Sequence, residues 1–152
     1  MTPGQLSAKV IAERVAWIRR MVASLRNLPG SGFATFQSDP RNIAAADSYL
    51  RRALEAVLDL GRHILAKGFG RGVSEYKDVA KVLVEVGVLD EPHGALLRDL
   101  AGYRNRLVHF YHDVSDLELY EIRTNRLGDI ESLVEAILQW INAHPARLDR
   151  EL

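Results

Sequence analysis

The chain has 152 residues, with 20 lysines and arginines against 20 aspartates and glutamates, so its formal net charge at pH 7 is zero. That balance argues against a protein that coats nucleic acid by bulk charge, but it is compatible with a small basic cleft. Hydrophobic residues make up 47% of the chain, which excludes a disordered protein, and the absence of cysteine excludes disulfides and thiolate metal sites.

The length predicts one domain that spans residues 1–152. No apolar run approaches the roughly 18 residues that a membrane span needs. Glu13 and Arg14 interrupt the N-terminal segment, where a signal peptide would have a continuous apolar core. We therefore expect a soluble, cytoplasmic protein.

Helical periodicity dominates the first half of the chain. Apolar residues at helical spacing predict a first helix within 6–25, and the proline and glycines of segment 27–33 end it. Asp39 and Pro40 form a typical helix start, because an acidic cap followed by proline suits the first turn. This second helix continues until the glycine-rich segment 67–74.

Three further helices follow in the second half. Ser74 is the expected cap of a short helix over 76–84, and Asp90 the expected cap of a fourth helix that runs through Val108. The stretch "SDLE", which Ser115 opens, fits a capping box and predicts the start of the last helix. Since no segment alternates with a period of two, the sequence predicts an all-α, antiparallel bundle of about five helices.

One arginine occupies the apolar face of the fourth helix. Arg104 lies in the middle of a face formed by positions 97, 100, 101, 104, 108 and 111. Because burying an unpaired guanidinium is costly, either a carboxylate from another helix pairs with Arg104 or this face lines a cleft. Glu55 and Asp59 of the second helix are the expected partners. With His63 they stand four apart on one helix face, which is a weak metal-ligand set but also predicts an Asp59–His63 pair.

Polar groups extend around the end of the same helix. On a straight helix Asn105 and His109 lie about 100° and 140° from Arg104, and Tyr111 returns to within about 20° of it. That arc is too broad for one pocket, so either the helix ends or bends near His109, or a second helix faces it across a groove. A two-fold dimer would supply such a helix. A locally paired arginine and a solvated histidine would account for the same spacing without any function.

The stretch "RNRLVHFYHDV" at 104–114 resembles the motif of HEPN-domain proteins, and more closely that of the HepT family. The family motif is arginine, four residues, histidine, one residue, tyrosine, and Arg104, His109 and Tyr111 have this spacing. The resemblance covers residues 53–114 throughout and includes "LYEI" at 119–122, whereas the first helix and the loop before the second match only loosely.

This resemblance implies an all-helical homodimer whose motif lines a cleft at the dimer interface. It implies a metal-independent endoribonuclease that acts as the toxin of a type VII-like toxin–antitoxin pair, without a cofactor. The implied partner is a minimal nucleotidyltransferase antitoxin, which silences the toxin by transferring AMP to the motif tyrosine, here Tyr111.

The residue types suit RNA cleavage by the 2′-hydroxyl. His109 can act as acid or base near neutral pH, and the planar guanidinium of Arg104 can bind two phosphate oxygens. Asn105 can orient the histidine or bond the phosphate, and Tyr111 can stack on a base or accept AMP. Asp59 or Glu55 would pair with the arginine in the absence of RNA.

Two other readings share parts of this pattern. The alternative to a ribonuclease is a non-catalytic helical dimer that binds a nucleotidyltransferase and, with it, a nucleotide. A metal-dependent hydrolase is disfavoured, because only five histidines and no cysteine are present. Arg106 and His112 are expected on the solvated surface.

Overall fold

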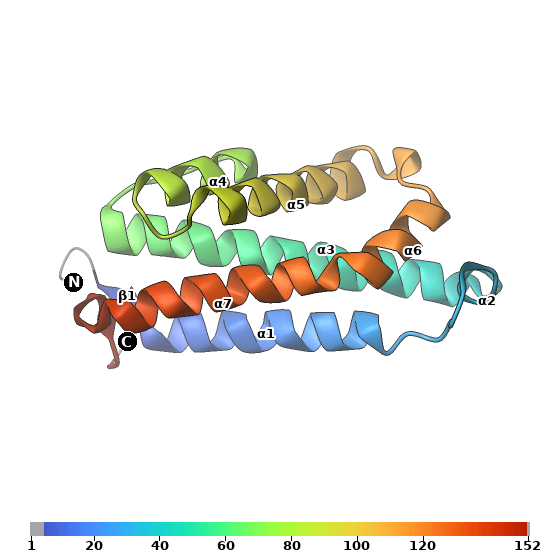
Figure 1. The fold of residues 1–152 in the computed structure, drawn as a ribbon, viewed down its shortest axis with the longest axis horizontal. Coiled ribbons are helices and arrows are strands. Elements are labelled where there is room, and N and C mark those ends of the chain that lie inside the picture. Colours follow the sequence, from blue (N-terminus) through green and yellow to red (C-terminus); the bar gives the residue numbers. More distant parts are fainter. Residues whose placement is uncertain (1–4, 152) are drawn as a thin grey trace.

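The computed structural model describes residues 5–151, except for the side chain of Tyr111. Within this range the chain forms an elongated bundle of seven α-helices (Figure 1). None of these helices combines the length and apolarity that a bilayer-spanning segment needs. Their bounds are α1 Ala8–Arg26, α2 Phe33–Gln37, α3 Pro40–His63, α4 Tyr76–Glu85, α5 Glu91–His109, α6 Asp116–Asn125 and α7 Leu127–Ala143.

Short turns and two very short strands complete the described chain. A π-helical turn, Ile64–Gly68, extends α3, and 3-10 turns at Tyr111–Asp113 and Pro145–Arg147 follow α5 and α7. The strands β1 (Leu6–Ser7) and β2 (Leu148–Asp149) pair in parallel at one end of the bundle, next to the two termini (Figure 1). Two residues are too few to show alternation, so the sequence pattern did not reveal these strands.

The helix α3 lies in the centre of the bundle. It contacts α1, α4, α5, α6 and α7, with α1 and α7 along one side and α4 and α5 along the other (Figure 1). It runs antiparallel to α1 and to α5. The predicted all-α, antiparallel bundle is therefore confirmed. The buried residues of α3 include Ala46, Leu50, Ala53, Leu54, Val57, Leu58, Leu60 and Gly61.

The expectation of about five helices is too low. The segment before α3 contains the five-residue helix α2, which buries Phe36 completely. The expected last helix is divided at Arg126, whose backbone (φ −113°, ψ −1°) separates α6 from α7. Since α6 and α7 both bury apolar residues, a break of one residue leaves the spacing almost undisturbed.

Helix caps follow the sequence at three of the four expected positions. Asp39, Asp90 and Ser115 each accept a hydrogen bond from a backbone N–H in the first turn of their helices. The prediction for Ser74 is wrong. Glu75 occupies the cap position of α4 and makes no capping hydrogen bond through its side chain.

One arginine of α6 holds the connection between α1 and α2. The Arg123 guanidinium donates to the backbone oxygens of Leu25 and Gly30, both at 3.1 Å, and to that of Leu28. Leu25 lies in the last turn of α1, and Leu28 and Gly30 follow the helix end, where backbone oxygens have few intrahelical partners. Arg123 thereby fixes the loop that matches the family only loosely.

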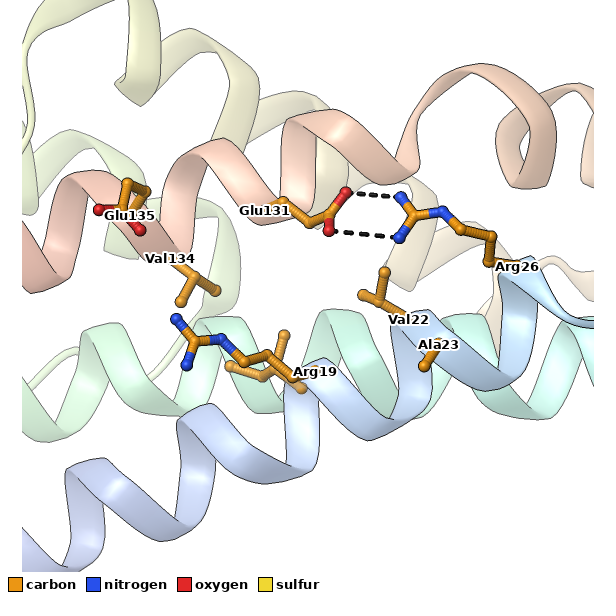
Figure 2. Close-up of a pocket in the computed structure, with 8 residues that line it drawn as sticks. Arg19, Val22, Ala23, Arg26, Glu131, Val134 and Glu135 are labelled. Atoms are coloured by element: carbon orange, nitrogen blue, oxygen red, sulfur yellow. Dashed lines mark hydrogen bonds and ion pairs between the residues drawn. The ribbon is translucent and has the colours of Figure 1, made fainter.

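A groove of about 390 Å³ separates α1 from α7 (Figure 2). Arg26 closes one end through two hydrogen bonds to Glu131, the shorter with 2.6 Å between Nη2 and Oε1. These hydrogen bonds hold the pKa of Glu131 below its usual range. Arg19 and Glu135 line the other end (Figure 2), and neither Arg104 nor His109 of the motif takes part.

A glycine allows α4 to approach α3 closely. A Cβ atom on Gly61 would lie 2.7 Å from Cγ1 of Val79 and 3.0 Å from Cδ1 of Leu83. Both distances are shorter than van der Waals contact. The position of α4, and of Tyr76 in its first turn, therefore depends on the absence of a side chain at Gly61.

We expect Gly61→Ala to lower the free energy of unfolding by about 1–3 kcal/mol, because the added methyl group forces α4 away from α3. The matched control is Gly102→Ala in α5, where nothing lies within 4 Å of the new Cβ. Here alanine should raise stability by up to about 1 kcal/mol through helix propensity. Urea denaturation followed by circular dichroism measures both changes, and equal effects of the two substitutions would contradict the close packing.

Candidate functional site

Arg104 is held between two helices. Its side chain is 20% exposed, and its Nε atom lies 3.4 Å from Oε1 of Glu55 on α3. This contact lacks hydrogen-bond geometry, since Nε is buried without a hydrogen-bond partner. The Nη1 atom donates to Oδ1 of Asn105 at 3.2 Å. Of the two expected carboxylates, Glu55 therefore pairs with Arg104, and it does so loosely.

Tyr76, the first residue of α4, makes an aromatic contact with this arginine. The guanidinium carbon of Arg104 lies 4.6 Å from the centre of the Tyr76 ring, a cation–π distance. The Tyr76 hydroxyl donates to Oδ1 of Asp59 at 2.7 Å. Asp59 thus acts on the arginine through the tyrosine, and not directly as expected.

The phenol of Tyr76 stays protonated at neutral pH. Burial, followed by the hydrogen bond to Asp59, raises its pKa above the usual value, and the charges of Arg104 and Arg62 oppose this rise. The sequence predicted only that Tyr76 begins a short helix. No local pattern connects it to the motif, because only the packing of α4 beside α3 and α5 brings them together.

A groove of about 480 Å³ opens beside these contacts. It is lined by three cationic side chains and one carboxylate. The carboxylate, Glu75, pairs with Lys77, with 3.3 Å between Oε2 and Nζ. The lining therefore carries more cations than carboxylates, while Glu55 and Asp59 lie beside two of those cations. The groove brings the predicted Arg104, Asn105 and His109 together. Its lining residues are Arg62, Ser74, Glu75, Tyr76, Lys77, Arg104, Asn105, His109 and Phe110.

The helix α5 ends at His109, which is exposed at the edge of the groove. Phe110 leaves helical geometry (φ −133°, ψ 41°), and its N–H donates to the Arg106 oxygen at 2.9 Å. Of the two expected alternatives, an end near the histidine is therefore correct. The apolar stripe does not continue to Tyr111, which begins a separate 3-10 turn. The predicted role of the Tyr111 side chain lies outside the described residues.

Arg106 lies at the surface as expected, with a side chain that is 37% exposed, but its guanidinium is paired. It donates to Oε2 of Glu118 at 2.8 Å and to the backbone oxygen of Asp113 at 3.0 Å. These bonds connect the end of α5 to the start of α6 and stabilise the turn after the motif. His112, by contrast, has a side chain that is 70% exposed and does not line the groove.

The acidic and histidine residues of α3 serve separate contacts. No group of three such residues within the described range has the geometry to hold a metal ion. The expected pair between Asp59 and His63 does not form, and Nε2 of His63 is buried without a hydrogen-bond partner. Burial, with added repulsion from Arg14 and Lys67, holds the pKa of His63 below its usual value.

This arrangement suits an anionic ligand. The guanidinium of Arg104 donates one hydrogen bond within the described residues, so donors remain for two oxygens of a phosphate. His109 lines the same groove, and histidine is the residue type most often used for general acid–base catalysis. The two groups that the sequence predicted to act together are thus available to one ligand.

Comparisons with known proteins give one family and one fold. Residues 11–137 match the sequence profile of the family described as HepT-like, "Ribonuclease HepT-like". The mRNA nuclease HepT of Shewanella oneidensis is 23% identical over 128 residues, which are 84% of this chain and 96% of that relative.

Two solved structures share the fold. The tri-AMPylated Shewanella oneidensis HEPN toxin in complex with MNT antitoxin has 22% identity and a TM-score of 0.77, over 86% of this chain and 97% of that one. YutE, a cytosolic protein of unknown function from Bacillus subtilis, has 23% identity and a TM-score of 0.72. The match covers 88% of this chain and 90% of YutE.

The lowered pKa of His63 predicts a loss of stability in acid. The folded chain binds this proton less readily than the unfolded chain, whose histidine has a pKa of about 6.5. Stability is thus held above that value and lost as the pH falls through the lower folded-state pKa. We expect His63→Gln to reduce the change in urea midpoint between about pH 7.5 and 5. His112→Gln, which alters an exposed side chain, should leave that change as in the wild type.

Proposed function

The chain belongs to the HepT-like family of HEPN proteins, and from this premise we propose that it is the toxin of a type VII-like toxin–antitoxin pair, a metal-independent endoribonuclease acting in the cytoplasm. Residues 1–152 would act as one HEPN/HepT-like helical domain. The groove that contains Arg104, Asn105 and His109 carries this proposal. It brings a phosphate-binding cation and a proton-transfer group to one surface.

The reaction would proceed by attack of the RNA 2′-hydroxyl on the adjacent phosphorus. A base takes the hydroxyl proton, the bond from phosphorus to the 5′-oxygen breaks, and an acid protonates that oxygen. Arg104 would bind the non-bridging oxygens and stabilise the added negative charge. His109 would act as one of the two proton-transfer groups, with Asn105 beside it to orient the phosphate or the imidazole.

Two proton transfers favour a homodimer. One chain offers one motif histidine, and a second copy would supply the other across a shared cleft. His109 and Phe110 lie exposed at the end of α5, and the Phe110 side chain is an exposed large hydrophobic group. A partner protomer at this end would cover Phe110 and place the second imidazole near the groove.

The contact between Arg104 and Glu55 suggests how RNA enters. At 3.4 Å and without hydrogen-bond geometry, the carboxylate balances the arginine without engaging its donors. A phosphate could therefore bind while Glu55 stays in place behind the guanidinium. Asp59 would support the same arginine indirectly, by holding the Tyr76 ring against it.

Silencing by the partner would act at Tyr111. A minimal nucleotidyltransferase would transfer AMP from ATP to the phenolic oxygen, with release of pyrophosphate and loss of the phenolic proton. Tyr111 begins the turn one residue after Phe110, which lines the groove. A bulky anion on this turn would compete with RNA for the positive groove.

The alternative is a non-catalytic helical dimer that binds the nucleotidyltransferase and a nucleotide. It would use the same fold and the same positive groove. The two functions differ in whether removal of His109 changes RNA cleavage.

We expect His109→Ala to lower the rate of RNA cleavage by about 10²- to 10⁴-fold, the usual contribution of general acid–base catalysis. Arg104→Ala should cause a comparable loss, and Arg104→Lys should restore only part of the rate because an ammonium cannot bind two oxygens in a fork. Cleavage of a labelled RNA by purified protein, in the presence of a chelator, measures these rates.

His112→Ala is the matched control, since this neighbouring histidine is exposed outside the groove. It should cleave RNA and arrest growth like the wild type when expressed without the partner. Growth arrest by His109→Ala equal to that of the wild type would refute the nuclease. Loss of cleavage on chelation would refute the metal-independent mechanism.

Incubation with the cognate nucleotidyltransferase and ATP should add AMP to Tyr111, detected by peptide mass spectrometry. Tyr111→Phe should remain unmodified because it lacks the accepting oxygen. Tyr103→Phe, which changes a half-buried tyrosine of α5, should be modified like the wild type. AMP on another residue, or equal modification of Tyr111→Phe, would argue against this mode of silencing.

A further inference from the structure

A second arginine, outside the sequence motif, lines the same groove. Arg62 of α3 has a side chain that is 39% exposed, and its Nη1 atom lies 3.8 Å from Oδ1 of Asp59. That distance is too long for a hydrogen bond, and the same oxygen already accepts the Tyr76 hydroxyl. Among residues 5–151, no hydrogen bond engages the Arg62 guanidinium, so its donors are available to a ligand.

The Tyr76 ring restricts both arginines. The guanidinium carbon of Arg62 lies 5.2 Å from the ring centre, and that of Arg104 lies 4.6 Å from it. The two carbons are therefore at most about 10 Å apart. Contact with an aromatic ring limits the freedom of a long side chain. The groove thus presents two neighbouring, partly ordered cations in place of one.

The third cation of the groove is less available. The ammonium of Lys77 lies 3.3 Å from the Glu75 carboxylate, which belongs to the same lining. Glu75 therefore neutralises Lys77 more closely than Asp59 neutralises Arg62. Of the three cations, Arg62 thus lies farthest from its neighbouring carboxylate, and it shares the Tyr76 ring with Arg104.

We propose that Arg62 binds a second phosphate of the RNA, next to the phosphate that Arg104 holds at the cleavage position. The groove would then bind two consecutive phosphates of one strand, with Tyr76 as the wall that spaces the arginines. This inference rests on the proposed ribonuclease function and adds a substrate-binding residue that the motif does not contain. The competing explanation is a surface ion pair between Arg62 and Asp59, which would contribute little.

The first test measures binding without cleavage. A short, labelled 2′-O-methyl RNA lacks the attacking hydroxyl, so fluorescence anisotropy reports affinity alone. Between about 50 and 300 mM salt, Arg62→Ala should reduce the slope of log affinity against log salt by about 0.7, the value for one lost contact to a single strand. Arg62→Lys should recover the slope, because it keeps the charge. Arg52→Ala removes an exposed arginine of the same helix outside the groove and should match the wild type.

The second test compares two substrates. For an RNA oligonucleotide, Arg62→Ala should raise KM by about 5- to 20-fold and leave kcat within about twofold, since a phosphate contact weakens binding without altering the reacting atoms. For a dinucleotide, which has only the scissile phosphate, both constants should stay unchanged. A merely structural role for Arg62 would lower kcat for both substrates equally.

These outcomes separate the inference from the proposed function. If the wild type binds RNA with the predicted Arg62 dependence but cleaves nothing, the nuclease fails and the second phosphate contact stands. If the wild type cleaves RNA while Arg62→Ala and Arg52→Ala behave alike, the nuclease stands and the contact is refuted. A wild type that does not bind the 2′-O-methyl RNA would also refute the contact.

Discussion

The side chain of Arg104 is only 20% exposed, and a cation in that position needs partners that replace its hydration. Glu55 supplies opposite charge, Asn105 an acceptor and Tyr76 the face of a ring. None of these contacts uses all of its donors. These contacts hold the Arg104 side chain in place and leave hydrogen-bond donors free to bind an anion. The residues that replace the hydration of Arg104 also shape the groove around it.

Packing in the core places these partners. The missing side chain of Gly61 lets α4 approach α3, and this approach brings Tyr76 within a hydrogen bond of Asp59. The end of α5 is set independently by Arg106, which bonds to Glu118 at the start of α6. The close packing at Gly61 and the bond from Arg106 to Glu118 thus position the two walls of the groove separately. Substitutions at either place would alter the spacing between the cations that line it.

The helix α3 combines two surfaces. Its apolar face, between Ala46 and Gly61, lies at the centre of the bundle. Its charged face supplies Glu55, Asp59 and Arg62 to the neighbourhood of the groove. Because packing in the core holds α3 rigidly, its charged side chains keep a fixed position relative to the residues of α5. A neutral chain can in this way present several cations, each with a carboxylate nearby, at one place without general affinity for nucleic acid.

The amino-acid sequence by itself determined the all-α class, the caps at Asp39, Asp90 and Ser115, and the grouping of Arg104 with His109, because these depend on neighbours within about one helical turn. Only the tertiary structure decided which carboxylate faces Arg104, and that Tyr76 and Arg62 share its groove. Tyr76 and Asp59 stand 17 residues apart on different helices. Their contact follows from how closely α4 packs on α3, a distance that no local spacing in the sequence expresses.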